Sequence, residues 1–315
     1  MQKSHLYAAG GLLAAALLAA GLVLLSHYHK PAKAVAAEAQ GLAKPRGLAL
    51  APDGGLYIVD SRNHRIEKRG ANGAMQRRFG KNGIRDGELR EPCGVALGKD
   101  GFLYVADTFY TLDPKGGLPW GRIQKFSADG VFAGSWGKVP VLPNDLFGPR
   151  DIAVDSKNFV YVSDTGDHRI VKYSSDGSFV KTWGKKGSAA GEFIEPFGIA
   201  FDDKDRLYVV DRLNFRVQIF DSNGKYLREF KADTGDQEQI NREPYVAVDS
   251  VRGWVWVSNP AAGHVSRYSL DGSGHKAYDT ALEGKLKQPT GMAVRPDGTL
   301  LVSDGEQGKI MTVKP

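Results

Sequence analysis

The residues of this chain that could do chemistry stand at recurring positions. Cys93 is the only cysteine among 315 residues, and a thiol needs a base within hydrogen-bond reach to act as a nucleophile. Seven histidines offer nitrogen ligands for zinc, which must converge to about 2.0 Å from the metal. Cys93, Arg46 and Arg150 each follow a proline directly. The spacing of these prolines therefore decides which side chains can meet.

The prolines mark six copies of one unit. They are Pro45, Pro92, Pro149, Pro196, Pro244 and Pro289, at intervals of 47, 57, 47, 48 and 45 residues. A second landmark follows each proline by 15 residues: Asp60, Asp107, Asp164, Asp211, Asn259 and Asp304. Self-similarity at such a period indicates a repeat architecture.

Each unit contains four short runs rich in β-branched and aromatic residues, as in PFGIAF, RLYVVD, RVQIF and YLREF of the fourth copy. Asp-Gly and Asn-Gly pairs between runs predict tight turns. Four antiparallel strands per unit are typical of a propeller blade. We therefore predict an all-β, six-bladed β-propeller of four-stranded antiparallel blades over residues 45–315, with the small first strand innermost.

The connectors KNGIRDGELREPCGVAL and KKGSAAGEFIEPFGIAF, and the stretch LYVVDRLNFRVQIF, resemble NHL repeats. The resemblance covers residues 45–315 and implies a six-bladed propeller of the bacterial kind that is exported or anchored in a membrane. That family includes enzymes, RNA-binding proteins and adhesion modules, so the resemblance implies no single activity.

The first and second strands of a blade are antiparallel, so the recurring Pro and Asp should share one face. The residues directly after each proline should then ring the mouth of the central channel: Arg46, Cys93, Arg150, Phe197, Tyr245 and Thr290. We predict that they bind ligand together with Asp151, and that both arginines are reached by solvent. A guanidinium suits carboxylates, and aromatic rings give rigid contact area.

The ring does not predict catalysis. Peptidyl-hydroxyglycine amidating lyases resemble this chain in fold and bind zinc through histidines directly after the blade-opening proline, where this chain has none. His64, His168 and His264 lie on alternate blades, too far apart to share a metal. Cys93 has no base in the ring, and the calcium ligands of gluconolactonase-like propellers are not evident. We predict no catalytic residue, no metal and no cofactor.

Asp151 occupies a position where four of the other five copies have glycine. We expect it to pair with a neighbouring arginine or a backbone amide rather than to bind calcium. The recurring Asp and the basic residue that follows it, such as Asp60 with Arg65, are expected to be structural, since they occur in nearly every copy.

The second copy carries an insertion, TFYTLDPKGGLPWG, at residues 108–121. We place it in the loop between the second and third strands, on the same face as the ring. Phe109, Tyr110 and Trp120 could anchor a ligand there, or fold back and cover the blade.

The first copy is basic, with Lys68, Arg69, Arg77, Arg78, Lys81, Arg85 and Arg90. This run forms a solvated outer edge, or faces anionic lipid or an acidic partner.

Residues 6–25 are uncharged and dominated by apolar residues, and a helix of that length spans a bilayer. We predict an anchor helix over residues 1–30 and a linker over 31–44, of which 34–39 could supply a closing strand. A cleaved signal peptide, giving a secreted protein, is the alternative. The predicted location is the inner membrane, single-pass, with the propeller in the periplasm or outside the cell.

These observations favour a binding scaffold over an enzyme. The predicted partner on the channel face is a protein, peptide or glycan, and an anionic one would suit the arginines of the ring. The alternatives are a lyase or hydrolase related to the amidating lyases or gluconolactonases, and an RNA-binding propeller. Export would separate the protein from RNA and so disfavours the last.

Overall fold

The computed structural model describes residues 41–110, 119–137, 145–235 and 243–315, without the side chains of 109, 110, 119 and 120. The chain divides into Met1–Gln40 and Gly41–Pro315, and the described residues all belong to the second unit. The predicted anchor helix, most of the linker and the proposed closing strand at 34–39 lie outside the described residues. None of the helices in the described part of the chain is long and apolar enough to cross a membrane.

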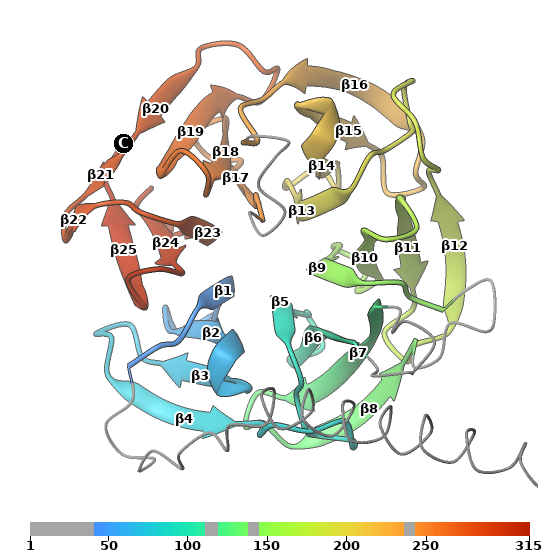
Figure 1. Cartoon of the computed structure of the whole chain (residues 1–315), viewed down its shortest axis with the longest axis vertical. Helices are drawn as coiled ribbons and strands as arrows, with labels where there is room; N and C mark the ends of the chain where they lie inside the picture. Colours follow the sequence, from blue (N-terminus) through green and yellow to red (C-terminus); the bar gives the residue numbers. More distant parts are fainter. Residues whose placement is uncertain (1–40, 111–118, 138–144, 236–242) are drawn as a thin grey trace, which may run out of the picture. The chain divides into compact units, whose positions relative to one another are not determined.

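The described unit is a ring of six antiparallel sheets, each with its first strand nearest the axis (Figure 1). Blade one contains β1 Pro45–Leu50, β2 Leu56–Asp60, β3 Arg65–Arg69 and β4 Met75–Phe79, with the 3-10 helix η1 Ser61–Asn63. Blade two contains β5 Pro92–Leu97, β6 Phe102–Tyr110, β7 Pro119–Ser127 and β8 Phe132–Trp136. Blade three contains β9 Pro149–Val154, β10 Val160–Asp164, β11 Arg169–Tyr173 and β12 Phe179–Trp183.

Blade four contains β13 Pro196–Phe201, β14 Leu207–Asp211, β15 Arg216–Phe220 and β16 Tyr226–Lys231, with η2 Arg212–Asn214. Blade five contains β17 Val246–Asp249, β18 Trp254–Asn259, β19 His264–Ser269 and β20 Lys276–Tyr278. The hairpin β21 Thr280–Ala281 and β22 Gly284–Lys285 follows. Blade six contains β23 Pro289–Val294, β24 Leu300–Asp304 and β25 Lys309–Val313.

The six-bladed architecture predicted from the repeats is confirmed. Five sheets have the predicted four strands, and in the part of the chain that the structure describes blade six has three, since the sixth copy ends after its third strand. The tip of the β21–β22 hairpin covers part of the outer edge of β25, where the Leu282 N–H donates to the Thr312 carbonyl at 2.8 Å. The Glu283 carboxylate accepts the Thr312 N–H at 2.6 Å.

The glycines of the first strands allow the blades to meet at the axis. A Cβ on Gly47 would lie 2.8 Å from the Cys93 carbonyl oxygen of the next blade. A Cβ on Gly291 would lie 2.3 Å from the Arg46 carbonyl oxygen, at the boundary between blades six and one. The side-chain-free position thus lets neighbouring first strands pack closely, which explains why the pattern Pro-x-Gly recurs.

Tyrosines of the second strands join three of the blades to the next one. Four tyrosines at equivalent positions of these strands, Tyr57, Tyr104, Tyr161 and Tyr208, are buried, and the hydroxyls of the first three donate to carbonyls of the following blade. The Tyr57 hydroxyl donates to the Ala128 carbonyl at 3.2 Å, and the Tyr161 hydroxyl to the Ser222 carbonyl at 2.8 Å. Each buried ring contributes apolar area, and its hydroxyl stays hydrogen-bonded.

The insertion in the second copy is not the loop that we predicted. It lengthens the second and third strands, β6 and β7, which pair as far as Phe109 with Trp120 and Tyr110 with Pro119. Only residues 111–118 separate the two strands. Both strands have nine residues, and they pair as one antiparallel ladder. The first and last residues of the insertion therefore belong to the blade.

Candidate functional site

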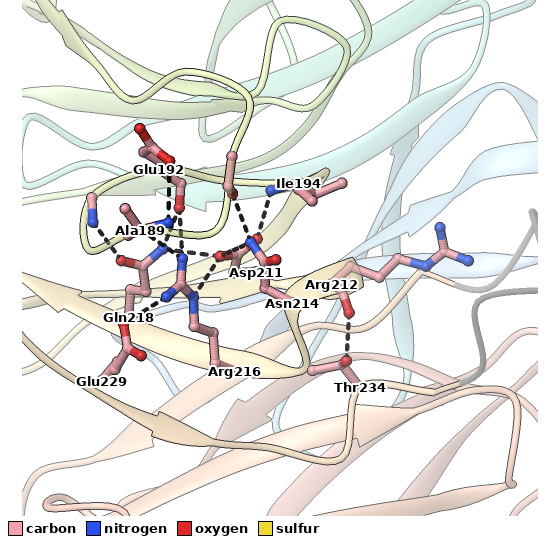
Figure 2. Close-up of polar contacts among 12 residues, drawn as sticks. Ala189, Glu192, Ile194, Asp211, Arg212, Asn214, Arg216, Gln218, Glu229 and Thr234 are labelled. Carbon is pink, nitrogen blue, oxygen red and sulfur yellow. Dashed lines mark hydrogen bonds and ion pairs between the residues drawn. The ribbon is translucent and has the colours of Figure 1, made fainter.

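The face that bears the blade-opening prolines, here called the Pro face, is held together by the recurring aspartates. In blade four, Asp211 accepts the backbone N–H of Ile194 at 2.8 Å, the Arg216 Nε–H at 2.8 Å and the Asn214 amide at 2.8 Å (Figure 2). Arg216 in turn donates to the carbonyls of Ala189 and Glu192, at 2.9 Å each. The connection between blades three and four is therefore fixed from blade four.

The same contact recurs around the ring. An aspartate at the end of the second strand accepts the N–H of the residue two positions before the blade-opening proline; these pairs are Asp60 with Ala43, Asp107 with Arg90, Asp164 with Phe147, Asp211 with Ile194 and Asp304 with Lys287. Basic partners pair with the carboxylates, as Arg65 does with Asp60 at 2.8 Å. The predicted structural role of the repeating Asp and Arg is confirmed.

The ring after the prolines is more buried than we predicted. The expectation that Arg46 is reached by solvent is wrong, because its side chain is only 1% exposed. Cys93, Phe197, Tyr245 and Thr290 are also buried. Arg150, with 15% of its side chain exposed, is the ring arginine that reaches the surface.

Arg46 is buried because acidic residues surround it. Its guanidinium lies 2.9 Å from Glu91 and 3.0 Å from Glu243, and donates to the Cys93 sulfur at 2.8 Å. Arg150 lies 3.4 Å from the same Glu243 oxygen. We call these five residues the Arg46 cluster. Buried charges must be paired, and this network pairs them.

The cluster sets the protonation of its members. Burial would raise the pKa of Glu243, but the charges of Arg46, Arg150 and Lys44 outweigh it and hold that pKa below its usual value. Burial raises the pKa of the Cys93 thiol despite the same arginines. The thiol donates to the Glu91 carbonyl at 3.1 Å and stays protonated at neutral pH. A protonated, buried thiol is a poor nucleophile, so Cys93 acts as a structural donor and acceptor.

Tyr245 and Thr290 hold the ring together. The Tyr245 hydroxyl donates to the Cys93 carbonyl at 3.3 Å, and thus joins blade five to blade two. The Thr290 hydroxyl donates to the Pro45 carbonyl at 3.0 Å, across the boundary between blades six and one. The hydroxyl groups of Tyr245 and Thr290 therefore donate their protons to the backbone of a neighbouring part of the ring.

A pocket of about 300 Å³ opens on the Pro face between blades three and four. We call it the Arg150 pocket; its lining residues are Phe147, Gly148, Arg150, Thr165, Gly166, His168, Glu195 and Phe197. The guanidinium of Arg150 lies over the Phe197 ring, 5.9 Å from its centre. Arg212 lies 5.8 Å from the same ring and 2.5 Å from Glu195. The pocket thus combines aromatic walls with a guanidinium.

The backbone fixes the histidine of this pocket. His168 adopts a left-handed conformation, with φ 54°, and its Nδ1 accepts the Glu195 N–H at 3.1 Å. The proton of the neutral imidazole must then reside on Nε2. Burial, aided by the charge of Lys186, lowers the pKa of His168, so the ring is neutral at pH 7. Nε2–H is a hydrogen-bond donor in this state and not a base.

The three histidines thought too distant to share a metal have separate partners. The His64 Nδ1 donates to the Arg90 carbonyl at 2.5 Å, and His264 lies 3.0 Å from the Asp233 carboxylate. Within the described ranges, no group of three or more His, Cys, Asp or Glu side chains is arranged to hold a metal ion.

Asp151 meets a backbone amide, as predicted. Its Oδ2 accepts the Ile199 N–H at 2.9 Å, and the side chain is 7% exposed. Burial raises the pKa of this carboxyl to about 7. Asp151 therefore keeps its proton to a higher pH than an ordinary aspartate does.

The aromatic residues of the insertion lie at the Pro face end of β6 and β7, but the side chains of Phe109, Tyr110 and Trp120 are outside what the structure describes. Their role as ligand anchors stays a prediction.

Of the basic run in blade one, Arg69 and Arg78 pair with the buried Glu67 at 2.9 and 2.8 Å. Arg77 is more open, with 52% of its side chain exposed.

Sequence reasoning missed the acidic half of the site. The residue before the blade-opening proline is Glu in three of six copies: Glu91, Glu195 and Glu243. All three lie against arginines of the Pro face. The three glutamates could have been identified by comparing the residue that precedes each blade-opening proline. Phe147 was also missed, because it belongs to a connection and not to a strand.

Comparison with known proteins supports the fold. The NHL-repeat family model matches residues 42–68 and 148–173. No curated protein matches the chain. Among solved structures, a gluconolactonase from Xanthomonas campestris is 16% identical, with 87% of each chain covered and a TM-score of 0.61.

Two further structures show how widely the architecture is used. Virginiamycin B lyase from Staphylococcus aureus is 16% identical, with 88% of this chain and 98% of that chain covered and a TM-score of 0.55. A chain of the nidogen/laminin complex is 15% identical, with 86% and 94% covered and a TM-score of 0.54. Identities this low establish the fold alone. The repeats, their two matches to the family model and the six-bladed ring support the interpretation of this chain as an NHL-repeat β-propeller.

Proposed function

We propose that the propeller is a binding module that takes a carboxylate-bearing ligand, such as a peptide end or an acidic glycan, in the Arg150 pocket. The observation that carries the proposal is the position of the Arg150 guanidinium, at the wall of a pocket between Phe147 and Phe197. A guanidinium recognises a carboxylate through paired N–H donors, and a partly buried site strengthens the interaction.

The histidine supports binding over catalysis. The Nδ1 lone pair of His168 is used by the Glu195 amide, so the imidazole offers a second N–H donor to an anion. In this tautomer His168 cannot act as a general base through Nδ1. The similar fold of virginiamycin B lyase and a gluconolactonase keeps catalysis on the same face as the alternative.

The test uses N-acetyl-phenylalanine as an aromatic carboxylate probe and its amide as the neutral control, with binding measured by calorimetry. The carboxylate should bind more tightly than the amide. Arg150→Ala should weaken carboxylate binding by about 1.5–3 kcal/mol. Arg77→Ala, on the outer edge of blade one, should leave binding unchanged. Equal binding of acid and amide, or loss of binding only in Arg77→Ala, would overturn the proposal.

Arg46 is left intact in this test. It is buried in an ion network, so its loss would disturb folding as well as binding. Trp120→Ala should weaken binding if the insertion contributes to the same site. Release of a product from the probe would favour the enzymatic alternative.

We also propose that the propeller works outside the cytoplasm, held at a membrane by residues 6–25. The uncharged length of that segment supports this. The protein should stay with membranes after a high-salt wash, and removal of residues 1–30 should release it. Soluble mature protein beginning near residue 37 would contradict the anchor.

A further inference from the structure

The central channel is a second cavity, separate from the Arg150 pocket. Its volume is about 290 Å³, and it is lined by the first strands of all six blades. The walls are mostly aliphatic; their large apolar side chains are Leu48, Leu50, Val95, Leu97, Ile152, Val154, Ile199, Phe201, Val246, Val248 and Met292. Such walls offer apolar contacts to a ligand, and the backbone of the first strands adds polar surface to the same channel.

The channel is closed toward the Pro face. The buried Arg46 cluster lies at that end, and the Tyr245 hydroxyl reaches across to the Cys93 carbonyl. Toward the opposite face, Leu97, Val154 and Phe201 line both the channel and an adjoining groove of about 470 Å³. A ligand would therefore enter from the opposite face and end near Asp151.

Among the described residues that line the channel, Asp151 alone is charged. Its carboxylate meets the amides of Ile199 and Ile152, and among the residues that the structure describes no basic side chain forms an ion pair with it. The corresponding residue is glycine in four other copies. A buried carboxylate without a counter-charge is costly, and a bound cation would offset that cost.

The groove at the channel entrance is acidic. Four aspartates and one lysine line it: Asp155, Asp202, Asp203, Asp205 and Lys99. Asp155 and Asp202 accept backbone N–H groups of their own turns, so their carboxylates are held in place. A negative entrance attracts cations and raises their local concentration.

We propose that the central channel binds a linear aliphatic amine, with the ammonium group against Asp151 and the alkyl chain along the aliphatic walls. A metal ion fits less well, because calcium takes six to eight oxygen ligands and the lining side chains supply one carboxylate. An ammonium has three donors and needs few acceptors. The Tyr245 oxygen, which donates its proton to Cys93, can accept at the same end.

The test uses the full chain, n-hexylammonium as the probe and 1-hexanol as a neutral control of equal length. Hexylammonium should bind at least tenfold more tightly than hexanol. Asp151→Asn keeps the size of the side chain and removes its charge, and should reduce hexylammonium binding at least tenfold. Asp151→Gly restores the residue of four sister copies and should have the same effect.

Arg77→Ala, on the exposed outer edge of blade one, serves as the control and should leave hexylammonium binding unchanged. Asp151→Asn should leave binding of N-acetyl-phenylalanine unchanged, because Asp151 does not line the Arg150 pocket, so the two proposals can fail independently. Circular dichroism checks that each variant is folded. Equal binding of hexanol and hexylammonium, or full hexylammonium binding by folded Asp151→Asn, would overturn the channel proposal.

Discussion

Arg46 and Glu243 form an ion pair of 3.0 Å inside the ring, between the first strand of blade one and the residue before Pro244. Both side chains are buried, with exposures of 1% and 8%. The pair therefore connects two non-adjacent blades across the Pro face end of the channel. Its pairing with Glu91 and Arg150 extends the connection to blades two and three.

Removal of Glu243 should destabilise the propeller strongly. Glu243→Ala leaves Arg46 short of a counter-charge in a buried site, which costs about 3–5 kcal/mol of unfolding free energy. The control is Glu306→Ala, because the Lys287–Glu306 pair of 3.4 Å is more than half exposed on both sides and should contribute about 0–1 kcal/mol. Denaturant unfolding compares the two variants, and equal losses would contradict the structural role of the cluster.

Asp151 should make the protein less stable as the pH rises. Its pKa is raised from 3.8 to about 7, so between these values the folded state keeps a proton that the unfolded state has released. Stability then falls with rising pH, by about 4 kcal/mol in total. Asp151→Asn should be more stable than the parent at pH 8 and equal to it at pH 4.

Burial also raises the pKa of Asp107 and of Asp164 to about 6, which gives the same direction of pH dependence. Both residues remain in the Asn variant, so the difference between parent and variant isolates Asp151. The measurement is unfolding by denaturant at both pH values. A difference that does not change between pH 4 and pH 8 would show that Asp151 keeps an ordinary pKa.

Asp211→Ala should open the connection between blades three and four. It removes the acceptor of the Ile194 N–H and a buried partner of Arg216, with an expected loss of about 3–5 kcal/mol. Hydrogen exchange of the Ile194 amide should accelerate. Asp167→Ala is the control, because Asp167 is 47% exposed although it pairs with Arg169. An unchanged exchange rate of the Ile194 amide in Asp211→Ala would show that the hydrogen bond to Asp211 does not hold this connection.

Gly198→Ala should strain the boundary between blades four and five. The added Cβ would lie 2.4 Å from the Tyr245 Cα, where only backbone movement can relieve the contact, at a cost of about 1–3 kcal/mol. Gly134→Ala in β8 has no atom within 4 Å and should be neutral or slightly stabilising. Thermal unfolding distinguishes them, and a neutral Gly198→Ala would mean that the blades can separate at little cost.

The sequence predicts the blade number and the Pro face because these depend on contacts that repeat at one spacing. Asp60 and its equivalents bind an amide at a constant separation in five of the six blades, so a single chain displays the pattern several times. The burial of Arg46 could not be predicted in the same way. It depends on Glu91 and Glu243, which meet it only after the ring has closed.

The insertion was misplaced for a related reason. Its Pro and Gly content is typical of a loop, but the pairing of Phe109 with Trp120 and of Tyr110 with Pro119 continues a ladder that starts at Phe102. Local composition does not report that the flanking strands are already in register. The tertiary context therefore overrides the local preference for a turn.

The aspartate contacts predict that circular permutation is tolerated in some loops of the propeller and not in others. New termini between Asp53 and Gly54 would interrupt a turn whose hydrogen bonds, from Gly54 N–H to the Ala51 carbonyl and from Gly55 N–H to Asp53, stay within it. New termini at Arg90 would cut a connection that Asp107 holds from the next blade. A permuted chain should keep its shape when opened at the first place and lose a blade-to-blade attachment at the second.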